Sequence, residues 1–144
     1  MEKYDALKLD DQLCFPLYAA SREVIKSYRP FLDAVGLTYT QYITMMVIWE
    51  VRKINVKELG DRLFLDSGTL TPVLKSLEAK GYITRNRSKE DERVLNVEIT
   101  ETGEKLKERA AEIPNKVSQR LKIALDDAKT LNSLLQKLLS TVRD

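Results

Sequence analysis

The apolar residues of this chain change their spacing once, between residues 82 and 99, and that change limits the folds available to it. On either side of this segment they recur every three or four positions, as on one face of an α-helix. Within it, "YITR" and "VLNVEIT" alternate apolar and polar residues and enclose the polar run "NRSKEDER". The pattern predicts a mostly α fold with a small β-hairpin that has a long charged tip.

The first long helix is expected to run from a cap at Asp10 or Asp11 to about Ala34. An aspartate can accept hydrogen bonds from the free N–H groups of a first turn, and Gly36 can adopt the left-handed conformation that ends a helix. Pro16 would then lie beyond the first turn, where a proline removes a backbone hydrogen bond. We therefore expect a bend at Pro16.

Two helices are expected next, over about 40–51 and 55–64. The first contains "YITMMVIW", which is so apolar that most of its surface must be buried. The second begins at a cap by Asn55, and its apolar residues follow helical spacing. Both are expected to pack into one core.

A fourth helix is expected over 67–80, ended by Gly81. Pro72 needs a place near the first turn, so regular helix is expected from about Thr69. The possible caps are the hydroxyl side chains of Ser67, Thr69 and Thr71.

After the hairpin, Thr100 is expected to cap a helical segment that is interrupted at Pro114. The chain closes with a long apolar stripe at helical spacing, formed by Leu131, Leu134, Leu135, Leu138, Leu139 and Val142. A protein of this size cannot easily cover such a stripe from within. We therefore expect one domain over 1–144, in which 1–36 and 101–144 form a two-fold homodimer and 37–100 forms a separate lobe.

The order of elements in that lobe is typical of a winged helix-turn-helix. In such a unit the second helix of the pair, here 67–80, enters the major groove of DNA, and the hairpin is the wing. Basic wing residues suit phosphates or a narrow minor groove, and Asp91 could hold Arg93 by a bidentate pair. The residues expected to contact double-stranded DNA are Ser67, Gly68, Thr69, Thr71, Pro72, Lys75, Arg85, Arg87, Lys89, Asp91 and Arg93.

Each part of this interface also has a simpler interpretation. A hydroxyl-rich helix start is usually only a cap, and a charged hairpin tip is usually only solvated surface or edge protection. The ordered combination is less ambiguous than its parts. No paired carboxylates, glycine-rich phosphate loop or nucleophile–base pair competes with it.

Composition narrows the function classes further. The 144 residues include no histidine, which removes the commonest metal ligand and general base, so we expect no enzyme activity, no metal site and no cofactor. The net charge is only +2, but residues 52–93 carry ten Lys/Arg against seven Asp/Glu, so the middle of the chain is basic. Neither a signal peptide nor a membrane span is apparent, so we expect a cytoplasmic protein.

The segment from "GDRLFLDSGTLTPVLKSLEAKG" to "YITRNRSKEDERVLNVEITETG" resembles the DNA-binding lobe of MarR-type transcriptional regulators, including the D-x-R wing formed by Asp91 and Arg93. The preceding "LCFPLYAASREVIKSYRPFLDAVGLTYTQYITMMVIWE" is similar to the organic hydroperoxide resistance regulators and to the staphylococcal thiol-based regulators of that branch. The resemblance covers essentially the whole chain, although the last forty residues match more in pattern than in letter. It implies a dimeric repressor of an inverted-repeat operator that is released on thiol oxidation.

Cys14 is the only cysteine, and a single cysteine on an apolar helix face is most often an inert core residue. Its place near a helix start, however, favours a thiolate. Tyr18 lies one turn further along the same face. Tyr28 lies about 21 Å along a straight helix, so it could reach a cysteine only across a two-fold axis.

Tyr42 is a further tyrosine near this region in the sequence. The resemblance implies a thiol that is hydrogen-bonded by tyrosines, partly from the second subunit: Tyr28 and Tyr39, with Tyr18 adjacent. Amphipathic packing is the simpler role for these rings. An organic hydroperoxide, or hypochlorite, would oxidise Cys14 to sulfenic acid. Without a second cysteine, this acid must end as a mixed disulfide with a low-molecular-weight thiol, as a cyclic sulfenamide, or in overoxidation.

Three alternatives remain open from the sequence. The chain could be a MarR-type regulator that responds to a small aromatic ligand, with a structural cysteine. It could be a thiol peroxidase, although no resolving route or base is evident beside the thiol. It could also be a purely structural helical dimer, for which DNA binding would be weak and without steep salt dependence.

Overall fold

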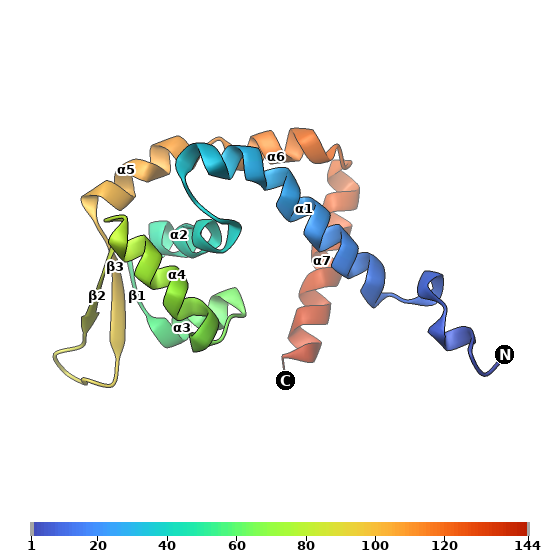
Figure 1. The fold of residues 1–144 in the computed structure, drawn as a ribbon, viewed down its shortest axis with the longest axis horizontal. Helices are drawn as coiled ribbons and strands as arrows, with labels where there is room; N and C mark the ends of the chain where they lie inside the picture. The colour runs from blue at the N-terminus through green and yellow to red at the C-terminus, as the bar shows by residue number, and fades with distance from the viewer. Residues whose placement is uncertain (1, 144) are drawn as a thin grey trace.

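The structure is a computed structural model that describes residues 2–143 and has two regions of different character (Figure 1). A lobe gathers short helices and a small sheet, and long helices lie along one side of it and extend away from it. The helices are α1 (Cys14–Val35), α2 (Tyr39–Val51), α3 (Val56–Leu63), α4 (Ser67–Ala79), α5 (Glu101–Ala110), α6 (Ile113–Leu121) and α7 (Leu125–Val142), preceded by the 3-10 turns η1 (Asp5–Leu7) and η2 (Leu9–Asp11). The predicted mostly α fold with a winged lobe is confirmed.

The sheet has three antiparallel strands, β1 (Lys53–Asn55), β2 (Ile83–Arg87) and β3 (Leu95–Ile99), in the order β1-β3-β2. The predicted hairpin is β2–β3, in which Arg85 lies opposite Val97. Strand β1 was not expected, because three residues are too few to show a period of two. It forms because a left-handed residue after α2, Arg52 at φ 67°, turns the chain so that the buried Ile54 pairs with Val97.

Helix caps explain most of the boundaries. Asn55 accepts a hydrogen bond from the Glu58 N–H (2.8 Å), and Thr100 accepts one from the Gly103 N–H (3.0 Å), so both predicted caps are confirmed. The predicted caps of α4 are wrong: Asp66 accepts from the Thr69 N–H (2.7 Å), and regular helix already begins at Ser67. The aspartate is the better cap because its charge also complements the positive end of the helix dipole.

The prediction for the start of α1 is also wrong. Asp10 and Asp11 lie in η2, and the residue before α1 is Leu13, which makes no side-chain cap hydrogen bond. Pro16 is therefore the third residue of the helix, where the backbone N–H has no partner within the helix, and no bend is required there. The interior proline is Pro30. The predicted helix end is confirmed, because Gly36 is left-handed at φ 71°.

The core lies in the lobe and beneath the second half of α1. It is formed by α2, α3, α4, the sheet and the inner faces of α5 and α6, with Met45, Ile48, Leu59, Leu70, Leu74, Leu77, Ile83 and Val97 almost fully buried. The chain passes closely at Gly103, where a side chain would collide with the Tyr82 carbonyl. At the same residue, the indole of Trp49 donates to the Gly103 carbonyl at 2.9 Å.

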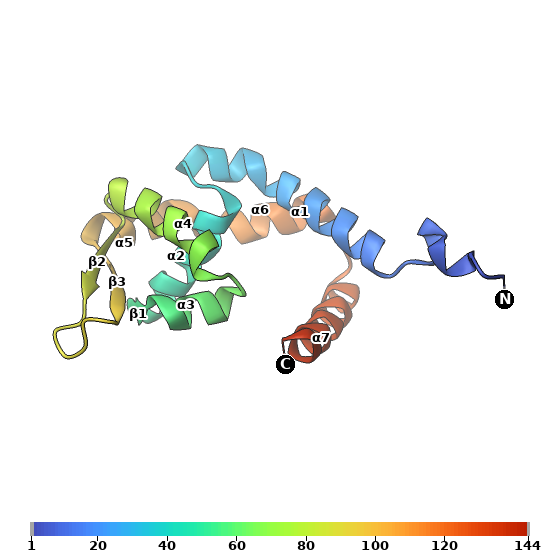
Figure 2. The ribbon, with the colours of Figure 1, turned by 60° about the horizontal axis from the view of Figure 1, so that its bottom comes forward.

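Helix α7 contributes no buried residue to this core. It leaves the end of α6 and runs apart from the lobe in both views (Figures 1 and 2). Leu131, Leu134, Leu138 and Val142 of the predicted stripe are exposed. The break between α5 and α6 falls at residues 111–112, just before Pro114, which occupies the first turn of α6. Among residues 2–143, no helix combines the length and the apolar character needed to cross a membrane.

Candidate nucleic-acid interface and thiol site

The start of α4 is held in a defined orientation by the turn that joins it to α3. Phe64 ends α3 in a left-handed conformation, at φ 57°. A side chain at Gly60 would lie 2.7 Å from the Leu65 carbonyl oxygen, so the turn packs closely on α3. Hydrogen bonds from Thr69 to the Asp66 carboxylate keep its pKa below the usual value, so this cap stays ionised at neutral pH. The first turn of α4 is therefore held by its cap and by the packed turn, and it faces solvent.

The predicted contact residues of α4 fall into two groups. Ser67, Gly68, Thr69, Pro72 and Lys75 are exposed on one end and one side of the helix. Thr71 differs from them, because its hydroxyl donates to the Ser67 carbonyl of its own helix at 2.6 Å. This arrangement leaves the hydroxyls of Ser67 and Thr69 exposed at the helix start, while the Asp66 carboxylate occupies the Thr69 N–H.

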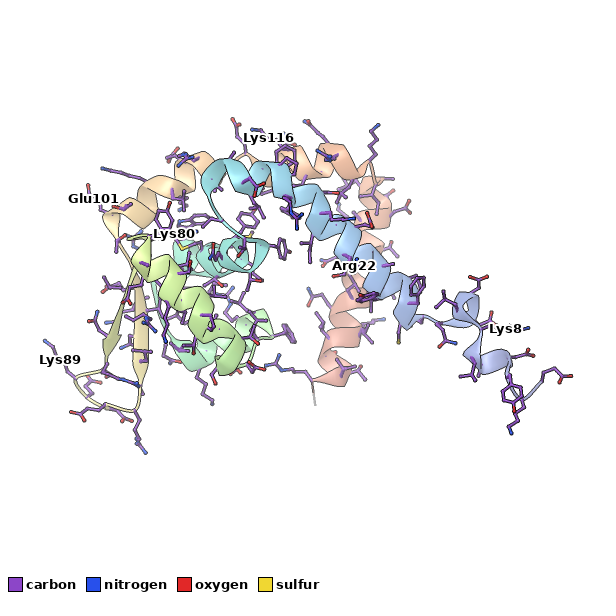
Figure 3. All side chains as sticks on the ribbon, viewed as in Figure 1. Lys8, Arg22, Lys80, Lys89, Glu101 and Lys116 are labelled. Carbon is purple, nitrogen blue, oxygen red and sulfur yellow. The ribbon has the colours of Figure 1, made fainter. Side chains whose placement is uncertain are left out.

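Two basic side chains near the turn of the hairpin face solvent, as expected for residues of a wing tip. Arg87 and Lys89 are exposed, and Figure 3 shows Lys89 extending from the hairpin loop. The predicted Asp91–Arg93 pair is confirmed as a bidentate contact, with Nε–Oδ1 at 3.0 Å and Nη2–Oδ2 at 3.1 Å. The hydrogen bonds from Arg93 lower the pKa of Asp91 and raise that of Arg93. Since the Arg93 side chain is 89% exposed, the pair orients a guanidinium that still faces solvent.

Arg85 does not lie at the wing tip, contrary to the prediction. It is in β2, its side chain is only 20% exposed, and its Nη2 contacts Oε1 of Glu78 in α4 at 3.0 Å. Its backbone N–H donates to the other oxygen of the same carboxylate at 3.2 Å. The side-chain hydrogen bond from Arg85 lowers the pKa of Glu78. Arg85 thus joins strand β2 of the wing to Glu78 in the last turn of α4.

Cys14 is the first residue of α1, and it is exposed. The simple interpretation of this cysteine as a filler of the chain's own core is therefore wrong. The surrounding apolar side chains Leu13, Phe15, Leu17 and Tyr18 are exposed as well. The Arg22 guanidinium, labelled in Figure 3, lies over the Tyr18 ring at 5.4 Å from its centroid. The thiol thus lies on an uncovered apolar surface at the free end of a helix.

Three tyrosines meet where the second half of α1 packs on α2. The ring centroid of Tyr28 is 5.0 Å from that of Tyr39 and 5.8 Å from that of Tyr42. Burial raises the pKa of all three hydroxyls, that of Tyr42 to about 12, so each remains a neutral donor at physiological pH. The structure brings together two of the predicted residues, Tyr28 and Tyr39, and places Cys14 and Tyr18 half a helix away.

Of the remaining residues in this region, Tyr42 is noted from the sequence only as a nearby tyrosine, and Arg143 is not predicted at all. Tyr42 completes the tyrosine cluster, and its spacing of three residues from Tyr39 on one helix could have indicated it. Arg143 lies at the end of α7, where its guanidinium is 4.5 Å from the Phe64 ring centroid and 3.6 Å from the Asp61 carboxylate. No sequence pattern indicates this contact, because it joins the last helix to the turn before α4.

Within residues 2–143, no group of three or more His, Cys, Asp or Glu side chains could hold a metal ion. The geometry instead offers an exposed helix start, a basic hairpin and one exposed thiol.

The chain is similar to known proteins over almost its whole length. The family model for the transcriptional regulator SarA/Rot matches residues 26–110. The chain is 49% identical over 140 residues to the organic hydroperoxide resistance transcriptional regulator of Bacillus subtilis (strain 168), covering 97% of this chain and 95% of that protein. It is 47% identical over 132 residues to the HTH-type transcriptional regulator SarZ of Staphylococcus haemolyticus (strain JCSC1435), covering 92% and 90%.

Among solved structures, reduced AbfR bound to DNA matches with a TM-score of 0.80 at 31% identity, over 99% of this chain and 100% of that one. AbfR is a protein of Staphylococcus epidermidis, and its overoxidised form bound to DNA matches with a TM-score of 0.79 over the same shares of both chains. A mutant of MarR from E. coli, complexed with operator DNA, has the same fold with a TM-score of 0.76 at 22% identity, over 96% and 99%.

These relatives are regulators and not enzymes, in agreement with the expectation from the missing histidines. The match extends over both the lobe and the long helices, and it includes the elements that carry Cys14, α4 and the wing. The chain therefore belongs to the MarR-type, SarA/Rot-related family of transcriptional regulators, in the branch of the organic hydroperoxide resistance regulators.

Proposed function

We propose that the chain is a cytoplasmic repressor that binds an inverted-repeat operator as a homodimer and releases it when an organic hydroperoxide oxidises Cys14. The observation that carries this proposal is the single cysteine, exposed at the first residue of α1, in a chain 49% identical to an organic hydroperoxide resistance regulator. An exposed thiol is accessible to a hydroperoxide in solution.

The DNA side of the proposal rests on α4 and the wing. The exposed start of α4 would enter the major groove, and Lys75 would follow it. Arg87, Lys89 and the oriented Arg93 would contact phosphates or the neighbouring minor groove. AbfR, which shares the fold over its whole length, was solved on DNA.

The dimer is supported by the apolar side chains that this chain leaves uncovered. They occupy the first turns of α1 and the length of α7, both outside the lobe. A second copy related by a two-fold axis would bury both surfaces at once. In that dimer Tyr28 and Tyr39 of one chain would approach Cys14 of the other, and Tyr18 would lie beside the thiol.

The chemistry is a two-electron oxidation of sulfur. The Cys14 thiolate attacks the terminal oxygen of the hydroperoxide, an S–O bond forms and the O–O bond breaks. The alkoxide leaves and takes up a proton to become an alcohol, and the thiol becomes a sulfenic acid. The peroxide supplies the oxidising equivalents, so no further oxidant is needed.

The new oxygen would disturb the tyrosine hydrogen bonds at the interface and shift the spacing of the two α4 helices. Half-sites lie a fixed number of helical turns apart, so a displacement of a few ångströms weakens binding. With one cysteine per chain, the sulfenic acid would end in a mixed disulfide with a low-molecular-weight thiol, in a sulfenamide or in overoxidation.

The test compares the wild-type chain with Cys14→Ser on duplexes selected from a random-sequence library by the reduced wild-type protein. Fluorescence anisotropy before and after one equivalent of cumene hydroperoxide measures release. We expect both proteins to bind when reduced, and only the wild type to lose affinity, by about tenfold or more. Mass spectrometry of the wild type should show one added oxygen on Cys14.

If Cys14→Ser still releases DNA after peroxide, the thiol is not the sensor. Release of both proteins by a small aromatic compound, with no response to peroxide, would instead support the ligand-responsive alternative. Weak DNA binding without steep salt dependence would contradict a role in binding operator DNA and would support the purely structural helical dimer.

A further inference from the structure

Gln41 is a buried polar residue to which the proposed function assigns no role. It lies in the first turn of α2 and is only 8% exposed. Its side-chain Oε1 accepts a hydrogen bond from the Thr38 backbone N–H at 3.0 Å, which closes a capping box with the Thr38 hydroxyl. Its Nε2 donates to the Ser76 hydroxyl at 2.9 Å, thirty-five residues away in α4. One amide therefore joins the start of α2 to the recognition helix.

Lys80, directly after the last residue of α4, contributes to the same junction. Its Nζ donates to Gln41 Oε1 at 3.2 Å and to the Gly36 carbonyl at 2.6 Å. Figure 3 labels Lys80 where α4 ends, beside the last turn of α1. Gly36 is the left-handed residue that ends α1, so the end of α1, the start of α2 and the end of α4 meet at one set of hydrogen bonds.

This junction is continuous with the tyrosine cluster. Tyr39 directly follows the cap residue Thr38, and Tyr42 directly follows Gln41. Both rings pack on Tyr28 of α1, at 5.0 and 5.8 Å between centroids. A displacement of α1 relative to the first turn of α2 would disturb the packing of Tyr28 on Tyr39 and Tyr42. It would also disturb the bond from Lys80 to the Gly36 carbonyl, and Lys80 is itself bonded to the Gln41 amide.

We propose that Gln41 is a positioning residue that couples the tyrosine cluster to α4, so that oxidation at Cys14 reaches the recognition helix through the Gln41–Ser76 and Gln41–Lys80 hydrogen bonds. This inference rests on the proposed function, since it concerns the response to oxidation. A buried amide suits such a role because hydrogen bonds are directional, and buried partners left unsatisfied cost free energy. Apolar packing at the same place would tolerate small sliding motions.

Ser76→Ala tests the coupling with little disturbance elsewhere. It removes the acceptor in α4 and leaves the capping box, the Lys80 contacts and all three tyrosines in place. Lys80→Met is the second variant, because it removes the other link between Gln41 and α4. Ser140→Ala is the matched control, since the Ser140 hydroxyl donates only within its own helix, to the Lys137 carbonyl.

The quantity measured is the ratio of operator dissociation constants for oxidised and reduced protein. We expect Ser76→Ala and Lys80→Met to lower this ratio by about three- to tenfold each, the size expected for one net hydrogen bond, and Ser140→Ala to leave it unchanged. A purely structural role would lower the melting temperature or weaken the reduced complex without changing the ratio.

If the wild type responds to peroxide and both variants keep its ratio within about twofold, the coupling role of Gln41 is wrong and the proposed function stands. If the wild type itself shows no response to peroxide, the proposed function fails and this inference fails with it. A lowered ratio in Ser140→Ala would also overturn the assignment, because the effect would then not depend on the Gln41 bonds.

Discussion

The lobe and the long helices outside it carry similar apolar side chains. The lobe buries these side chains within one chain, whereas the first turns of α1 and the length of α7 leave them exposed. In the lobe, the leucines of α4 are almost completely buried within a single chain: Leu70, Leu74 and Leu77. In α7, leucines at the same helical spacing remain exposed, Leu134 by 57%. A helical spacing of apolar residues therefore indicates an apolar face, but it does not indicate whether the same chain or another chain buries that face.

The difference also separates the two functions that we propose. The lobe is stabilised by its own core, so it can present α4 and the wing in a defined geometry. The first turns of α1, with Cys14, and the α7 stripe have no such core in one chain. In the proposed dimer, a chemical change at the thiol would therefore act on a surface that one chain leaves uncovered.

The largest expected effect is a loss of stability when the core of the lobe is changed. Leu74→Ala should lower the free energy of unfolding by about 2–5 kcal/mol, because it removes buried methyl groups and leaves a cavity. Urea denaturation at several protein concentrations measures this loss, which should be independent of concentration. Leu134→Ala is the comparison on α7, and its effect should be small at low concentration and grow with dimer formation. An equal loss for both variants in dilute protein would contradict the distinction between the two regions.

A second expectation concerns the uncovered stripe. Leu134→Glu should raise the dimer dissociation constant by about 10- to 100-fold, since burial of a leucine side chain contributes about 1.5–3 kcal/mol. Analytical ultracentrifugation measures the change. Gln136→Glu adds the same charge to the same helix outside the stripe and should leave the constant unchanged. If both variants dimerise like the wild type, α7 is not part of the interface.

The smallest expected effect lies at the boundary between the two regions, in the tyrosine cluster. The pKa of Tyr42 is raised to about 12 in the folded protein, above its ordinary value of 10.0. The folded state therefore holds this proton more tightly, and its contribution to stability is complete below pH 10 and is lost as pH rises from about 10 towards 12. Urea denaturation over this range should show a steeper loss for the wild type than for Tyr42→Phe.

Tyr4→Phe is the control for that experiment, because Tyr4 lies exposed in the N-terminal segment. It should follow the wild type at every pH. Equal slopes for the wild type and Tyr42→Phe would show that the cluster is not buried in solution.

Most of the secondary structure could be predicted because its causes are local. The caps Asn55 and Thr100, the left-handed Gly36 and the alternation of the hairpin each act over a few neighbouring residues. The errors at the start of α1 and α4 differ in kind. At α4 several residues are able to cap, and the path of the preceding turn places Asp66 there. At α1 the predicted caps Asp10 and Asp11 lie in η2, and no side chain caps the helix.

The site was predictable where a short spacing defines it. Asp91 and Arg93 form their pair across two residues, and the predicted geometry is confirmed. Arg85 was misplaced because its partner, Glu78, lies in another element, and a basic residue in a strand looks the same whether it is free or paired. Strand β1 was missed for a similar reason, since it exists only through its pairing with β3.

The sequence by itself determined the succession of helices and hairpin, the apolar faces, and the presence of a single thiol near a helix start. These follow from periodicity and composition, which need no knowledge of distant contacts. Only the tertiary structure decided that Tyr28, Tyr39 and Tyr42 meet, that Gln41 bonds to Ser76, and that Arg143 contacts Phe64. Hydrogen bonds and ring contacts act over a few ångströms, so residues far apart in the chain form them only where the packing of the whole fold brings them together.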